Sequence, residues 1–86
     1  MHTASFSVST TRVLIVPSDS ITREIYVHAI GAGTVYLGGA DVTAATGMLT
    51  EKNAIPFTMT LPAGETLYAI TASGTEQVRV MTPSID

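Results

Sequence analysis

The chain is built from short segments in which apolar and polar residues alternate, and turn residues separate these segments about every ten positions. The clearest segment is FTMTL at 57–61, where Phe57, Met59 and Leu61 alternate with threonines, as in a strand buried on one face. No segment keeps a helical period for longer than one turn. We therefore expect an all-β fold, a small antiparallel β-sandwich or partly open barrel of about seven short strands with one long loop.

Two of the expected strands carry predictions about their neighbours. Residues 12–16 begin with Arg12 and then form an apolar run, so the expected strand has apolar side chains on both faces. This pattern favours a central strand over an edge strand. Residues 21–30 alternate with a period of two, and Arg23 is the one intruder on the apolar face. The glycine-rich turn at 31–34 leads into a β run at 35–37. We expect the runs on either side of this turn to pair as an antiparallel hairpin.

The long loop is expected at residues 40–56, after two glycines that end the β run. The Ala-containing piece at 43–46 is the sole helix candidate, and Gly47 would stop it. Met48, Leu49 and Ile55 are large apolar residues within this loop. They either fold back to close one end of the sandwich or form a hydrophobic contact surface, a role that suits methionine.

The N-terminal residues 1–11 contain Phe6 and Val8 among hydroxyl residues. This alternation is typical of an edge strand, or of an extended arm laid on a partner. We keep both interpretations and assign residues 12–86 to a single β-sandwich domain. In the arm interpretation, Phe6 and Val8 contact the partner, and removal of the first ten residues weakens attachment to the partner more than it weakens folding.

Charge and composition exclude several classes of function. Charged residues make up 13% of the chain, the net charge is −3, and the four basic residues are scattered singly. Nucleic-acid binding requires clustered cations, so we do not expect it. The chain has no cysteine, its longest apolar run is far too short to cross a bilayer, and its N-terminus does not resemble a signal peptide. A mean hydropathy of +0.37 favours burial of surface against other copies or a larger assembly.

No residue set indicates catalysis, a cofactor or a metal. Residues 31–33 read Gly-Ala-Gly, but Tyr36 stands where a dinucleotide fingerprint requires glycine, so a turn is the better interpretation. The two histidines, His2 and His28, lack a partner at ligand spacing, because Glu24 lies four residues from His28 along a strand, about 13 Å away. We expect a non-enzymatic protein with no catalytic, cofactor or metal residue.

A succession of segments that begins at residue 35 carries a family resemblance. It reads VYLGGADVT at 35–43, followed by GML at 47–49, LPAGETLYAI at 61–70, SGT at 73–75 and VRV at 78–80. This succession of strands and turns, over about residues 12 to 82, resembles small β-sandwich virion proteins of tailed bacteriophages. The chain departs from that pattern at 51–56, where a shorter turn with glycine is expected.

The resemblance implies a structural role, foremost that of a capsid decoration (cement) protein. It implies the major capsid protein as partner, a homo-oligomer with a trimer favoured, and a location on the outer capsid surface after synthesis in the cytoplasm of the bacterial host. The contact residues expected on this basis are Phe6, Val8, Met48, Leu49 and Ile55. A tail or head-tail accessory protein and a carbohydrate-binding module for host-surface glycans are the alternatives.

Overall fold

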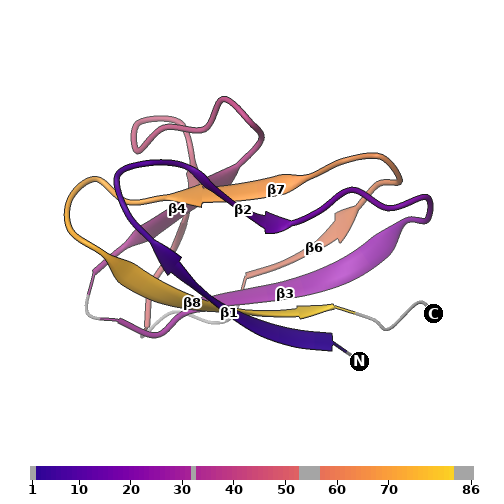
Figure 1. Cartoon of the computed structure of the whole chain (residues 1–86), viewed down its shortest axis with the longest axis horizontal. Coiled ribbons are helices and arrows are strands. Elements are labelled where there is room, and N and C mark those ends of the chain that lie inside the picture. The colour runs from indigo at the N-terminus through magenta and orange to yellow at the C-terminus, as the bar shows by residue number, and fades with distance from the viewer. Residues whose placement is uncertain (1, 32, 53–56, 83–86) are drawn as a thin grey trace.

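The protein is a sandwich of two four-stranded antiparallel sheets, and the expected fold class is confirmed (Figure 1). The computed structural model describes residues 2–31, 33–52 and 57–82. Sheet A has the strand order β1-β8-β3-β6, and sheet B has the order β2-β7-β4-β5. The strands are β1 (His2–Val8), β2 (Val13–Val16), β3 (Arg23–Ala29), β4 (Val35–Gly38), β5 (Met48–Thr50), β6 (Phe57–Leu61), β7 (Leu67–Ile70) and β8 (Glu76–Thr82).

The chain crosses from one sheet to the other at almost every step. β4 and β5 are the one pair of consecutive strands that hydrogen-bond to each other within the described residues. The expected hairpin between 21–30 and 35–37 is therefore wrong, because β3 lies in sheet A and β4 in sheet B. The glycine-containing connection between them bridges the two layers, a path that strand pattern alone does not distinguish from a tight hairpin.

β2 is an edge strand, contrary to the central position expected for residues 12–16. Its pairing with β7 shifts between Leu14 and Val16, as in a β-bulge. The extra residue lets the successive side chains of Ile15 and Val16 both reach the core, while Leu14 remains 39% exposed. The apolar character on both faces thus comes from the bulge and an exposed leucine rather than from burial between two neighbouring strands.

Residues His2–Val8 form an edge strand of sheet A, which corrects the arm interpretation. β1 pairs with β8 in unbroken register, from His2 opposite Thr82 to Val8 opposite Glu76. Val8 is fully buried in the core and Phe6 packs against it. Removal of the first ten residues would therefore expose the core along β8, and we no longer expect folding to survive that deletion.

The expected long loop contains a strand, β5, so the described structure has eight strands rather than seven. The helix candidate at 43–46 is a single turn, in which the amides of Thr46 and Gly47 both donate to the Thr43 carbonyl at 3.1 and 2.9 Å. One turn is too short to gain from helix propagation. Residues 53–56 lie outside the described part of the chain.

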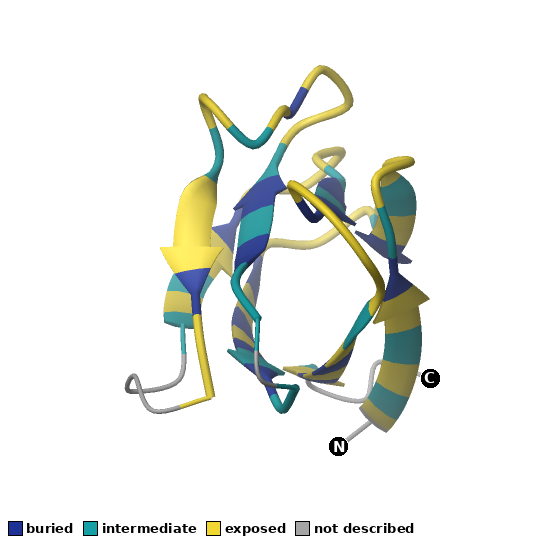
Figure 2. Cartoon of the chain, turned by 90° about the vertical axis from the view of Figure 1, so that its left-hand side faces the viewer, coloured by how far each residue is buried: buried dark blue, intermediate teal, exposed yellow. Residues whose placement is uncertain are grey.

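The core lies between the facing surfaces of the sheets, and along β3 and β4 buried and less buried residues alternate (Figure 2). Arg23 is also on this inner face and is 6% exposed. Its Nη2 donates to the Pro17 carbonyl at 2.9 Å, while its Nε has no partner among the described residues. The buried apolar residues that form this core cluster are Val8, Ile15, Val16, Ile25, Val27, Ala29, Val35, Leu37, Leu61, Leu67, Ala69, Val78 and Val80.

Candidate functional site

The predicted contact residues do not form one patch. Val8 belongs to the core, and this fact corrects its assignment as a contact residue; Phe6 is partly buried against the core. Met48 and Leu49 are the most exposed large apolar side chains among the described residues, at 62% and 59%. They are consecutive on β5 and therefore point to opposite faces of sheet B. Ile55 lies outside the described residues.

The outer face of sheet B carries a continuous set of apolar and aromatic side chains. Leu14 on β2 is opposite Tyr68 on β7, and Tyr36 on β4 is opposite both Leu49 on β5 and Ile70 on β7. Directly opposite residues of antiparallel strands share a face, so all four strands contribute to this surface. Leu14 and Leu49 are exposed, the tyrosines are half-buried and Ile70 is nearly covered. We define the sheet B face as Leu14, Tyr36, Leu49, Tyr68 and Ile70.

The loop between β4 and β5 rises above sheet B and packs back onto it (Figure 1). Val42 in this loop is only 3% exposed. Its side chain occupies the space left by two glycines, because a Cβ at Gly38 would lie 2.7 Å from Val42 Cγ2 and a Cβ at Gly47 would lie 3.0 Å from the same atom. Arg12 Nη1 donates to the Val42 carbonyl at 3.4 Å, which ties β2 to the loop. The loop therefore forms a raised, packed border to the sheet B face.

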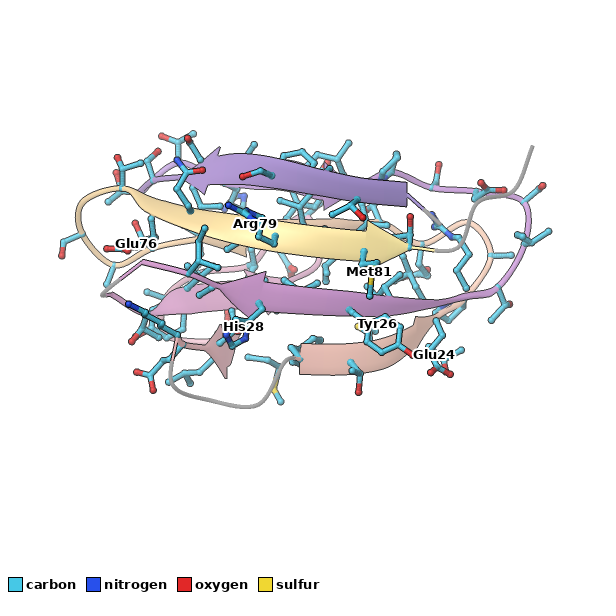
Figure 3. The ribbon with its side chains drawn as sticks, turned by 90° about the horizontal axis from the view of Figure 1, so that it is seen from below. Glu24, Tyr26, His28, Glu76, Arg79 and Met81 are labelled. Carbon is cyan, nitrogen blue, oxygen red and sulfur yellow. The ribbon has the colours of Figure 1, made fainter. Side chains whose placement is uncertain are left out.

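The outer face of sheet A has a different chemistry (Figure 3). Tyr26 on β3 is opposite Met81 on β8, and His28 is opposite Arg79 in the next row. With Thr3 and the adjoining backbone, these side chains line a shallow hollow of about 220 Å³. We define the sheet A face as Thr3, Tyr26, His28, Arg79 and Met81. Hydroxyl residues flank it on both edge strands: Ser5 and Ser7 on β1, and Thr58 and Thr60 on β6.

Local hydrogen bonds hold two polar side chains of the sheet A face, those of Tyr26 and His28. The Tyr26 hydroxyl donates to the Glu24 carboxylate at 3.2 Å, and His28 Nε2 donates to the Lys52 carbonyl at 3.0 Å. His28 Nδ1 is buried and has no hydrogen-bond partner in the described part of the chain. The Tyr26 hydroxyl and His28 Nε2 are thus engaged in local hydrogen bonds rather than directed at one point above the hollow.

The glycine-containing connection between β3 and β4 is occupied by an acidic side chain. The Glu76 carboxylate lies so close to Gly31 and Gly33 that a Cβ at either position would collide with it. The absence of side chains at these glycines therefore makes room for Glu76. A negative group in this position opposes phosphate binding, which agrees with our interpretation of Gly-Ala-Gly as a connection rather than a nucleotide loop.

Neither a metal-binding cluster nor a membrane-spanning helix is found among the described residues. There, no group of three or more His, Cys, Asp or Glu side chains is arranged to hold a metal ion. In the same residues, no helix is long and apolar enough to span a membrane. Two further side-chain hydrogen bonds join a hydroxyl to an acid, Thr34 Oγ1 to Glu51 at 2.7 Å and Ser20 Oγ to Asp19 at 3.4 Å, and both lie on the exposed surface.

Comparison of the chain with protein-family models, with curated proteins and with solved structures finds no significant match. The two outer faces are therefore assessed on their own chemistry. Our sequence reasoning missed the contributions of Leu14, Tyr36 and Tyr68 to the sheet B face. The alternation in the short β7 segment does separate Tyr68 from its core-facing neighbours Leu67 and Ala69, but nothing in the local pattern says which strands lie beside it.

Proposed function

We propose that the chain is a structural protein without catalytic activity that attaches to a larger protein assembly through the sheet B face. The family resemblance implies that this assembly is the capsid of a tailed bacteriophage and that the partner is its major capsid protein. In this proposal the chain is a decoration protein on the outer surface of the virion. The observation that carries it is the exposed apolar and aromatic surface formed by all four strands of sheet B.

The composition of this surface suits a protein partner. None of the four sheet B strands contains a charged residue. Tyrosine is enriched at the energetically important centres of protein interfaces, and charged residues are depleted there. Tyr36 and Tyr68 are half-buried and held by their strands, so little side-chain freedom is lost when a partner covers them. The exposed Leu14 and Leu49 add apolar area on either side.

A decoration protein acts by covering area on several subunits at once. Each contact can be weak, because the first contact raises the effective concentration for the next. A homo-oligomer, with a trimer favoured by the resemblance, multiplies the number of such contacts. The raised border formed by Val42 and its loop gives the sheet B face a fixed outline, which would help to set the orientation of the chain on the shell.

The proposal is tested by placing charges on the sheet B face. We expect the double variant L14E/L49E to bind at least tenfold more weakly to empty shells assembled from the major capsid protein of the phage that encodes the chain, as measured by co-sedimentation. The matched control T58E/T60E places the same two charges on exposed positions of β6, on the outer side of sheet A, and should bind as the unchanged protein does.

The outcomes separate the alternatives. Circular dichroism and thermal melting of each variant establish that it is folded before binding is compared. Equal binding by L14E/L49E and the unchanged protein contradicts the assignment of the sheet B face. Binding to purified tails but not to shells contradicts the decoration role and favours a tail or head-tail accessory protein.

A carbohydrate-binding module is the second candidate, and the hollow on the sheet A face is the observation that favours it. Tyr26 offers an aromatic surface there, and the walls of the hollow, to which Arg79 and Thr3 also contribute, are apolar. A glycan array tests this function. Retention of the unchanged protein, lost in Tyr26→Ala and kept in L14E/L49E, would support glycan binding and count against the capsid role.

A further inference from the structure

Each sheet ends in two edge strands, and the four edges differ in how open they are to pairing. β2 is four residues long and bulged, and β5 has three residues. β6 has five residues and is followed directly by Pro62. Short length, bulges and proline are devices that prevent an edge from adding another strand. β1 has none of these protections.

β1 is seven residues long and pairs with β8 without a register shift. Between Thr3 and Val8 it contains no charged residue and no proline. In the described part of the chain its other side has no neighbouring strand. Alternate residues of an antiparallel edge strand present N–H and C=O groups outward. β1 therefore offers a regular ladder that another strand can complete.

We propose that β1 pairs with β1 of a second copy of this chain, antiparallel and around a two-fold axis at Ser5. This proposal does not depend on the capsid function, and it replaces the trimer that the resemblance favours with a two-fold dimer. It joins the two A sheets into one continuous sheet of eight strands. A two-fold contact uses the same surface on both partners, so the strand has to be complementary to itself.

The residues of β1 meet this requirement. With Ser5 opposite Ser5 of the second copy, Thr3 faces Ser7 and Ala4 faces Phe6, so the strands overlap over their whole length. The outward-facing pairs are then all hydroxyl residues, which form favourable cross-strand pairs. On the core side, Phe6 of each copy faces the small Ala4 of the other. Phe6, now only partly buried, gains cover from the second copy.

Neighbouring registers are less favourable. If the pairing shifted by one residue, Ser5 of one copy would lie opposite Phe6 of the other. The hydroxyl residues of one copy would then lie on the core side of the other. A shift by two keeps the faces aligned but leaves strand ends unpaired, and in one direction it sets Phe6 against Phe6. Gln77 on β8 bonds to two hydroxyls of β1: its Oε1 accepts from Ser5 Oγ at 3.4 Å and its Nε2 donates to Ser7 Oγ. The hydroxyl row of β1 is therefore already ordered against β8.

The test uses charge at the two-fold axis. Ser5 is exposed, so Ser5→Lys and Ser5→Glu leave the core intact, but each variant puts two like charges opposite each other in the dimer. Sedimentation equilibrium should give a dimer for the unchanged protein, with a dissociation constant on the order of micromolar, as expected for a small interface. Ser5→Lys should weaken association at least tenfold, whereas Ser5→Glu should weaken it less, because Arg79 on β8 lies opposite residue 5 and offsets the added negative charge. An equimolar mixture of the two should restore a dimer, because lysine then faces glutamate.

Thr58→Lys is the matched control. It places the same charge at an exposed position on β6, the opposite edge of the same sheet, and should dimerise normally. Hydrogen exchange gives a second measurement, in which β1 amides become more protected as protein concentration rises. Several results would overturn the proposal: an unchanged protein that stays monomeric at millimolar concentration, a trimer, Ser5→Lys that still dimerises, loss of the dimer in Thr58→Lys, or a mixture that remains monomeric.

Discussion

Sheets A and B have similar inner faces and very different outer ones. The outer face of sheet A carries the charged residues Glu24 and Arg79, whereas Arg23 lies on its inner face. The strands of sheet B contain no charged residue. A solvated outer face normally carries polar and charged side chains that alternate with the core residues. Sheet A follows this rule and sheet B departs from it, and this difference is the basis of our proposal that the sheet B face contacts a partner.

The second difference lies in what packs on each outer face. A loop of the same chain packs on sheet B, where Gly38 and Gly47 leave room for Val42. The sheet A face instead has an open hollow between Tyr26 and Arg79. We conclude that sheet B is built to keep an apolar surface in a fixed shape, whereas sheet A can accept changes on its outer side with little cost. The following predictions measure this asymmetry.

The largest effect is expected inside the sandwich, and it sets the scale for both outer faces. Leu61→Ala should lower the free energy of unfolding by about 2–5 kcal/mol, because it leaves a cavity at a position that is 3% exposed. Phe57→Ala should fall at the lower end of that range, since Phe57 is only partly buried. Urea denaturation followed by circular dichroism measures both values. A cost below about 1 kcal/mol for Leu61→Ala would contradict its place in the core.

Gly47→Ala should be the most costly substitution on the outer side of sheet B. The added Cβ would lie 2.6 Å from Tyr36 Cβ and 3.2 Å from the Leu37 backbone nitrogen, and such overpacking costs about 1–3 kcal/mol. Gly39→Ala is the control, because its Cβ would meet only Asp41 Oδ1, at 3.6 Å. Thermal unfolding of the two variants compares them directly, and equal melting temperatures would show that the loop is not packed at Gly47.

Val42→Ala should lower stability by about 1.5 kcal/mol, from two buried carbons at about 0.8 kcal/mol each. The same change should make the loop between β4 and β5 more sensitive to limited proteolysis, because the side chain that holds it to Gly38 is gone. Met48→Ala, at a 62% exposed position, serves as the control and should change stability by less than about 0.5 kcal/mol. Similar losses in the two variants would contradict the packed border.

Tyr26→Phe should have the smallest effect, within about 0.5 kcal/mol. It removes one exposed hydrogen bond, from the Tyr26 hydroxyl to Glu24, and water replaces that bond readily. Urea denaturation at two salt concentrations measures the change. A loss above 1 kcal/mol would mean that the sheet A face contributes to stability as sheet B does, and the proposed asymmetry would fail.

Local pattern predicted most of the strands but not their arrangement. The alternation at 57–61 and 76–82 reports burial on one face, and burial is a property of each residue with its immediate neighbours. Pairing depends on segments far apart in the chain, so the hairpin expected after β3 was wrong. The central position expected for β2 was wrong for a related reason, since a bulge reproduces the apolar signal of a central strand.

The same limit applies to the candidate site. Met48 and Leu49 were found from the sequence because they are large apolar residues in a presumed loop, and both are exposed. Their use as contact residues stays a prediction. Tyr36 and Tyr68 meet on one face only because β4 lies beside β7, a pairing between residues about thirty positions apart. No signal in either segment alone indicates that neighbour.

The position of β8 has a consequence for synthesis of the chain. β8 lies between β1 and β3 and is the one strand that joins them. Until β8 has been synthesised, β1 has no hydrogen-bonding neighbour in its own layer, and its apolar side chains are not yet held in the sandwich. Assembly of the sandwich should therefore be a late, largely all-or-none event on the millisecond-to-second timescale of folds dominated by distant pairings.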